Sequence, residues 1–166
     1  MLYKILITLL VSLSFLLSGC SVVNSVKMIR ANNDLQAIWP EGKAVQQLEA
    51  IYIGEKPYIR VTANDNEELL FLIDTGASFT ALFDTEKGRP LEKEKGFDLI
   101  IAGWGDEEDT HAYQSSLKSL HIGDVGFEDV KVAFIPLSTT KYYMRTDEAI
   151  FDGVLGHDLL RHFSWK

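Results

Sequence analysis

One aspartate stands in the segment best suited to acid-base chemistry, Asp74-Thr75-Gly76-Ala77-Ser78. Asp74 follows the unbroken apolar run Leu69 to Ile73, which is typical of a strand covered on both faces. A carboxylate at such a strand end is held rigidly, and Gly76 lets backbone N–H groups approach its oxygens. Thr75 offers a hydroxyl that can fix the loop, and the two small residues that close the segment leave room for a partner loop or a substrate. The pattern suits a catalytic carboxylate, but this segment alone leaves a polar turn equally open, because Asp and Gly are common turn residues.

A second landmark lies 80 residues further on, where Val154-Leu155-Gly156 stands within the segment Ala149 to Leu160. The run from His157 to Phe163 follows it, and its apolar members are spaced to share one helical face. We therefore expect a helix of two turns directly after this second motif.

These two segments, in this order, resemble those of the retropepsin-like aspartic proteases, specifically the bacterial single-lobe relatives of the retroviral enzymes. Residues 70–78, LFLIDTGAS, are similar to the active-site strand and loop of that family. Residues 152–160, DGVLGHDLL, are similar to its hydrophobic-hydrophobic-glycine motif with the helix that follows, and residues 117–134 resemble the strand pair after the flap. The resemblance implies an all-β fold, a single-lobe acid-protease barrel with one short C-terminal helix.

The resemblance also implies a mechanism in which two aspartates, one from each lobe, face each other around a water. The chain has one such motif, so activity requires a homodimer acting on a peptide or protein substrate, with no cofactor. In this interpretation Asp74 is the catalytic carboxylate, Thr75 grips the partner loop and Gly76 is a backbone donor. The segment Gly103-Trp104-Gly105 stands where the family places its flap.

The amino-terminal end is typical of a bacterial lipoprotein signal. The 13 residues from Ile5 to Leu17 carry no charge, and Lys4 precedes them. A spanning helix needs about 20 apolar residues and a signal only about 7 to 15. The run ends in Leu-Ser-Gly before Cys20, the only cysteine, which resembles a lipobox. We expect lipid on Cys20; the alternative is an ordinary cleaved signal with the cysteine near the cut.

This end of the chain also predicts a domain division and a location. We assign residues 1–19 to the signal peptide, 20–50 to a tether and 51–166 to the protease-like domain, in the bacterial cell envelope. The serine after Cys20 favours the outer membrane. Cleavage leaves 15 basic and 24 acidic side chains, a net charge of −9, which disfavours nucleic acid and anionic membrane surfaces as partners. Membrane attachment is then expected to come from the lipid.

Other chemistries have less support in the sequence. Of the four histidines, only His157 and His162 are close in sequence, and a spacing of five residues does not place both on one helical face. We therefore expect no metal site. The chain has no serine nucleophile elbow, and its cysteine stands at the processing site.

The pattern departs from the family at its end, because the sequence stops three residues after Phe163, where the family continues into a further strand. Three functions stay open: an endopeptidase active as a homodimer, a non-catalytic lipoprotein that serves as a binding or assembly module, and a structural lipoprotein whose Asp74 loop is only a turn.

Overall fold

The computed structural model describes residues 21–64, 67–91, 94–101, 110–136 and 151–165, and strands dominate them. The elements are β1 (Ile51–Ile53), β2 (Lys56–Ala63), β3 (Glu67–Ile73), β4 (Ala81–Phe83), a short 3-10 helix (Arg89–Leu91), β5 (Asp98–Ile101), β6 (Thr110–Ile122), β7 (Val125–Ile135), β8 (Gly153–Leu155) and α2 (His157–Leu160). The predicted β-dominated fold with a short helix near the C-terminus is confirmed.

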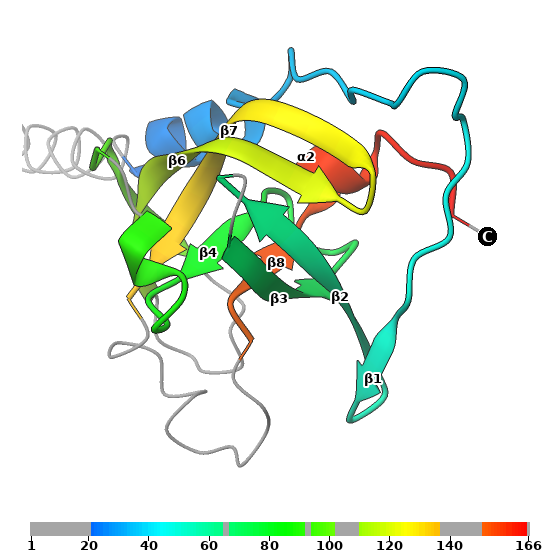
Figure 1. The fold of residues 1–166 in the computed structure, drawn as a ribbon. Helices are drawn as coiled ribbons and strands as arrows, with labels where there is room; N and C mark the ends of the chain where they lie inside the picture. The colour runs from blue at the N-terminus through cyan, green and yellow to red at the C-terminus, as the bar shows by residue number, and fades with distance from the viewer. Residues whose placement is uncertain (1–20, 65–66, 92–93, 102–109, 137–150, 166) are drawn as a thin grey trace, which may run out of the picture.

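All eight strands form one mixed sheet with the order β1-β2-β3-β8-β4-β7-β6-β5 (Figure 1). β8 lies between β3, to which it is parallel, and β4, to which it is antiparallel. β2 also pairs with β6 near the ends of both strands. Because this pairing joins strands that are distant in the sheet order, the sheet curls back on itself into a barrel-like form.

The predicted central strand has both faces covered, as its composition indicates. Leu69 and Phe71 are buried in the main core, which also contains residues of β6, β7 and α2. Leu70 and Leu72 point the other way and pack, partly buried, on a second cluster. A strand between two apolar clusters has little freedom to slip in register, because a one-residue shift would exchange its two faces.

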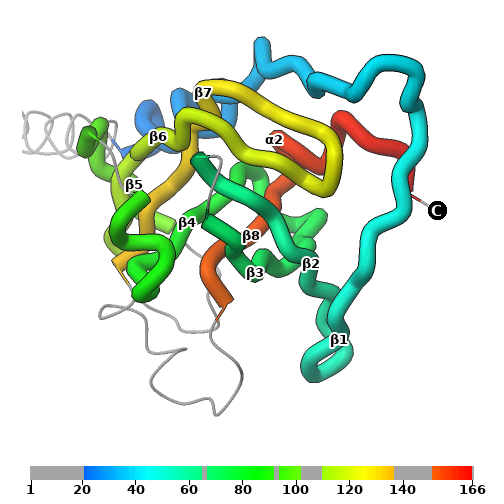
Figure 2. Tube along the Cα trace, in the orientation of Figure 1, coloured from blue at the N-terminus to red at the C-terminus, as the bar shows by residue number. Residues whose placement is uncertain are grey.

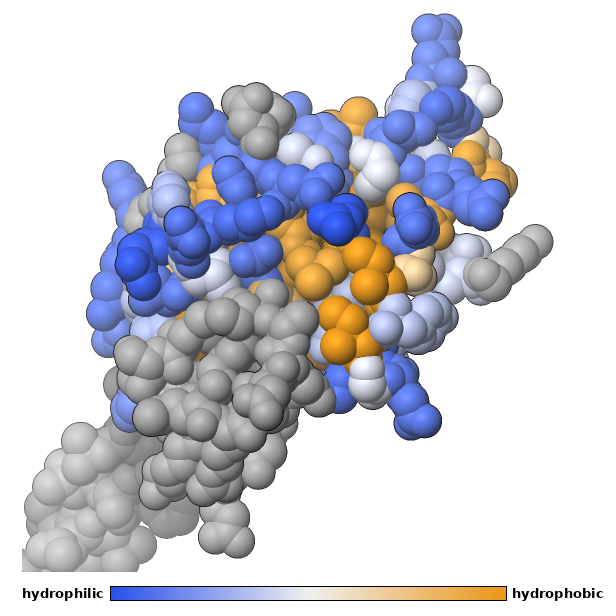
Figure 3. Space-filling view, turned by 60° about the horizontal axis from the view of Figure 1, so that its bottom comes forward, coloured by the Kyte–Doolittle hydropathy of each residue, from blue (hydrophilic) through white to orange (hydrophobic). Residues whose placement is uncertain are grey.

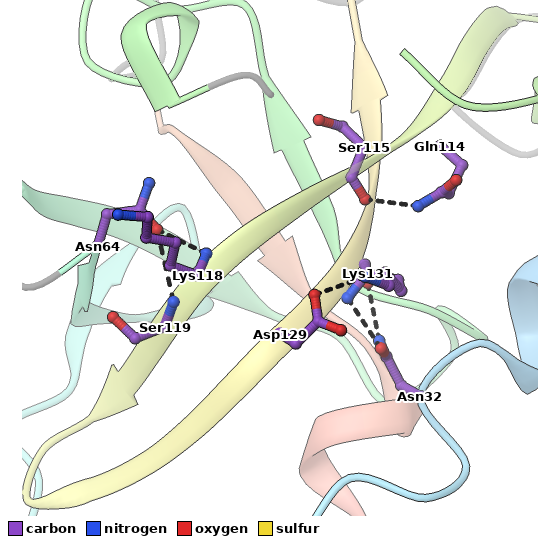
Figure 4. Close-up of polar contacts among 8 residues, drawn as sticks. All are labelled: Asn32, Asn64, Gln114, Ser115, Lys118, Ser119, Asp129 and Lys131. Atoms are coloured by element: carbon purple, nitrogen blue, oxygen red, sulfur yellow. Dashed lines mark hydrogen bonds and ion pairs between the residues drawn. The ribbon is translucent and has the colours of Figure 1, made fainter. Parts of the chain in front are cut away.

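Two turns contain residues with positive φ, at Gly123 and at Asn64. β6 and β7 form a long antiparallel hairpin whose connection contains Gly123 at φ +60°, a conformation that favours glycine. Asn64 ends β2 at φ +49°, and its side-chain oxygen accepts the Lys118 N–H at 2.8 Å (Figure 4). The turn after β2 is thereby fastened to β6.

Helical structure differs from the prediction in two respects. The helix α2 ends at Leu160, so it has one turn where two were expected. Residues 21–30 are also helical, although no helix was predicted there.

The chain from residue 31 to residue 50 runs along the outside of the domain before it enters β1 (Figure 2). Ile38 forms a β-bridge with Gly126, and the Gln46 side chain bonds to the backbone at Ile122 and Asp124. The predicted domain boundary at residue 50 stays a prediction, but these contacts show that the described part of the segment lies against the domain. Among the described residues, no helix is long and apolar enough to cross a bilayer.

Candidate active site

Asp74 is the first residue after β3, and β8 fixes its backbone. Ile73 pairs with Leu155, and the Asp74 N–H donates to the Leu155 carbonyl at 3.1 Å. The parallel pairing of β3 with β8 thus continues as far as Asp74. Because β8 is buried between two strands, the carboxylate projects from a rigid base.

The loop after Asp74 is a tight turn that closes on the carboxylate. The Gly76 N–H donates to Asp74 Oδ1 at 2.8 Å, and the Ala77 N–H donates to the Asp74 carbonyl at 3.2 Å. A Cβ added at Gly76 would lie 3.2 Å from the same Oδ1, a tight contact. Glycine therefore suits this position because the backbone N–H must approach the carboxylate closely. Thr75 and Ser78 are exposed, and Ala77 is partly buried.

The second predicted motif, Val154-Leu155-Gly156, lies directly against the first. Val154 pairs with Leu72 on one side and Ala81 on the other. The His157 N–H donates to the Ala77 carbonyl at 2.7 Å. A Cβ at Gly156 would lie only 2.4 Å from the Phe79 carbonyl oxygen. The two motifs therefore form one packed unit, and only glycine allows the backbone after β8 to approach the Asp74 loop so closely.

Two buried carboxylates, which no sequence pattern marks for this role, hold this unit together. The side chain of Asp152, directly before β8, accepts bonds from the Leu70 N–H at 2.9 Å and the Thr85 hydroxyl at 2.6 Å. Asp158, in α2, accepts the Thr80 hydroxyl at 2.8 Å. The Thr80 oxygen in turn accepts the Gly156 N–H at 3.2 Å. These bonds link β3, β4, β8 and α2 around the base of the loop.

Asn32 is a third buried polar residue that the sequence did not reveal. Its side-chain amide donates to Asp158 Oδ2 at 2.6 Å. The amide also donates to the Lys131 carbonyl at 2.7 Å, and the side-chain oxygen accepts the Lys131 N–H at 2.9 Å, as Figure 4 shows. The nearest sequence signal is the Asn32-Asn33-Asp34 cluster, which reads as an ordinary turn. Asn32 therefore connects the amino-terminal segment to the carboxylate that supports the Asp74 loop.

The face below the loop combines polar groups with accessible apolar ones. Figure 3, with the lower side of Figure 1 turned forward, shows hydrophobic side chains reaching the surface among hydrophilic ones. A groove of about 890 Å³ lies between residues 39–50, the ends of β2 and β3, and residues 162–165. Ile73, the neighbour of Asp74, is one of its lining residues, together with Trp39, Ile59, Phe163 and Trp165. The groove can accept apolar groups; it reaches the end of β3 through Ile73, but its lining does not include Asp74 or the loop that follows.

His162 lies at the end of this groove. Burial lowers the pKa of His162 below its ordinary 6.5, the positive charge of Arg161 lowers it further, and Asp158 opposes the change. Its Nε2 is buried with no hydrogen-bond partner in the described part of the chain, and its ring packs edge-on against Phe127. The neutral imidazole is therefore the form that the folded chain accommodates.

Several predicted residues cannot be placed in this site. Cys20, the predicted lipid attachment point, and Gly103, Trp104 and Gly105 of the predicted flap lie outside the described residues. Within the described ranges, no group of three or more His, Cys, Asp or Glu side chains is arranged to hold a metal ion.

A strand-end carboxylate in an Asp-Thr-Gly turn, backed by a buried hydrophobic-hydrophobic-glycine strand, is the arrangement of an aspartic-protease lobe. The sequence model of the aspartyl protease family matches residues 59–159, which include both motifs. The chain therefore belongs to the aspartyl protease family.

Comparison with solved structures gives a similar protein, a retropepsin-like aspartic protease from Rickettsia conorii. The two chains share 20% sequence identity and a TM-score of 0.49, over 80% of this chain and 83% of the other. The comparison with curated proteins found no match.

Proposed function

We propose that this chain is an aspartic endopeptidase of the bacterial cell envelope, anchored by lipid on Cys20 and active as a homodimer. The observation that carries the proposal is that hydrogen bonds fix Asp74 in place. Its N–H donates to the Leu155 carbonyl, and its carboxylate accepts the Gly76 N–H. A carboxylate aligned in this way keeps the orientation that proton transfer requires. The family assignment supports the same activity.

The mechanism needs a second carboxylate, which a second copy of the chain would supply. Two carboxylates that share a water cannot both ionise easily, so one proton is held between them. The ionised carboxylate takes a proton from the water, and the oxygen of that water attacks the scissile carbonyl carbon. The protonated carboxyl meanwhile donates a hydrogen bond to the carbonyl oxygen. The exposed Thr75 hydroxyl is available to bond to the partner loop.

The sheet offers an edge that supports association of two copies. β1 stands at the end of the strand order, and β2 is its one partner among the described strands. Ile51 and Ile53 are partly buried, whereas Tyr52 is exposed. A strand edge of this kind can pair with an identical edge of another copy.

The test compares wild type with Asp74→Asn on a denatured protein substrate at mildly acidic pH. Asp124→Asn is the matched control, because it makes the same chemical change in the exposed β6–β7 turn, where the aspartate pairs with Lys43. We expect cleavage by wild type and by the control, and none by Asp74→Asn. If wild type produces no more cleavage than Asp74→Asn, the proposed endopeptidase activity is refuted.

A second function follows from the groove between residues 39–50 and residues 162–165. Its apolar lining residues, which include Ile59, Ile73 and Trp39, would suit a binding or assembly module that retains the lobe without turnover. Sedimentation of the mature chain over a range of concentrations discriminates between the two. A chain that stays monomeric at high concentration cannot form the dyad, and that result would favour the binding module.

A further inference from the structure

The helical residues 21–30 have the reverse of the usual orientation of a surface helix. A helix on a globular domain normally turns its apolar side to the core. Here Met28 is the one apolar residue of the segment that is buried, and the inward side is otherwise polar. The Asn24 amide, for example, donates to the Asp98 carbonyl at 2.9 Å. The packing of this segment on the domain therefore leaves its other aliphatic residues exposed.

Those aliphatic residues form a stripe on the outer side. Four residues share it, with exposed fractions of 65% for Val22, 51% for Val23, 40% for Val26 and 44% for Ile29. Their spacing places them on one side of a helix. A contiguous apolar stripe on a surface commonly marks a contact site.

Charge indicates the nature of the contact. Of the 16 basic and 24 acidic side chains, three basic and no acidic ones precede Asp34. Two of these, Lys27 and Arg30, are exposed and lie beside the stripe. Lys27 also lies over the Phe97 ring, and the nearby Asp98 is paired with Lys95. The net charge of the whole chain disfavours an anionic surface, but this end of the chain is locally basic. An apolar stripe flanked by basic groups therefore fits the interface of an anionic bilayer, with the acidic remainder of the chain directed away from it.

The position of the helical segment in the chain also favours a bilayer as its contact. The segment follows Cys20 directly, and the uncharged run Ile5 to Leu17 precedes that cysteine. Lipid on Cys20 would hold residue 21 at the bilayer surface, so the stripe would meet lipid before any other partner.

We propose that residues 21–30 lie in the surface of an anionic membrane, with Val22, Val23, Val26 and Ile29 in contact with the acyl chains and Lys27 and Arg30 at the headgroups. This inference rests on the proposed envelope anchoring and is independent of catalysis. Since acyl chains on Cys20 supply most of the affinity, the helical segment acts chiefly by fixing the orientation of the domain. β1 lies at the opposite end of the molecule from this segment (Figure 1), so a docked helix leaves the β1 edge free.

The test uses the full chain with an environment-sensitive fluorescent amino acid in place of Val26. The protein is reconstituted in vesicles of phosphatidylethanolamine and phosphatidylglycerol with brominated acyl chains, which quench a buried fluorophore. The matched control carries the same amino acid in place of Tyr52, a residue that is 71% exposed on β1. Both positions lie on the surface, so neither change removes a core contact, and circular dichroism checks the fold of each variant.

We expect most of the emission to be lost at position 26 and none at position 52. A Lys27→Gln, Arg30→Gln double variant should show weaker quenching, close to that in uncharged phosphatidylcholine vesicles. Equal emission at positions 26 and 52 overturns the proposal, whatever the state of Cys20. Mass spectrometry of the same samples reports the lipid on Cys20, so failure of the anchor is seen separately, and failure of the protease leaves this readout unchanged.

Discussion

Replacement of Asn32 by alanine tests whether the amino-terminal segment supports the candidate site. The side chain makes three hydrogen bonds, at 2.6, 2.7 and 2.9 Å, to Asp158 and to both backbone groups of Lys131. Asn32→Ala removes all three bonds, and Asp158 keeps only the bonds to its other oxygen, from the Thr80 hydroxyl and the Leu159 N–H. A neutral hydrogen bond contributes about 1 kcal/mol net and one to a charged group about 1.5–3 kcal/mol, so we expect a loss of about 3–5 kcal/mol. Water that enters the space could reduce the loss to about 2 kcal/mol.

Urea unfolding measures this loss, with Asn24→Ala as the matched control. Asn24 lies on the same segment and loses one exposed bond, to the Asp98 carbonyl, so its change should cost less than about 1 kcal/mol. A loss of about 3 kcal/mol in a chain of this size lowers Tm by roughly 6–12 °C. Hydrogen exchange at the Gly156 amide should also quicken in Asn32→Ala, because Thr80 bonds to both Asp158 and this amide.

The reasoning fails if the two alanine variants are equally stable. Such a result would mean that other groups replace the contacts of Asn32 without cost. Residues 21–50 would then contribute little to the free energy of unfolding of the domain. Unchanged exchange at Gly156 in a destabilised Asn32→Ala would limit the role of Asn32 to general stability.

Three further predictions concern the rest of the site. Since the pKa of His162 is lowered in the folded chain, the unfolded chain binds a proton first as the pH falls, and the stability should decrease below about pH 6.5. His162→Phe should flatten this decrease, which urea midpoints at several pH values would measure. Gly156→Ala should cost more than about 2 kcal/mol through its 2.4 Å contact with backbone, whereas Gly42→Ala, in open space at φ +74°, should cost only about 1 kcal/mol. When wild type is unfolded and refolded with an equal amount of Asp74→Asn, specific activity per wild-type chain should halve, because only about one quarter of the dimers keep both aspartates; full retention would contradict the shared site.

The sequence predicted those parts of the site whose signals are local. The apolar run before Asp74 and the glycines around Val154 and Leu155 carry their own geometric requirements, and the structure brings them together as one unit. The family resemblance supplied the meaning of the two segments in this order, whereas their pairing was first seen in the structure.

The supporting contacts could not be predicted, because their partners are remote in sequence and polar in type. Asn32 and Asp158 are 126 positions apart, and each alone reads as an ordinary solvated residue. The helix α2 was overestimated because Phe163 continues the apolar spacing although the helix has already ended. The helical residues 21–30 were missed although Val22, Val26 and Ile29 have a helical spacing, because the segment was interpreted as part of a polar tether.

The position of β8 between β3 and β4 has a consequence for the order in which the chain matures. Leu70 and Asp152, whose bonds align β8 with β3, are separated by 82 residues, so the closure entropy of a long loop must be overcome before these strands meet. During synthesis, the Asp74 turn therefore emerges long before the strand that gives it its shape. A chain that is still unfolded consequently carries an aspartate without a formed site, and the proposed cleavage chemistry would be withheld until folding is nearly complete.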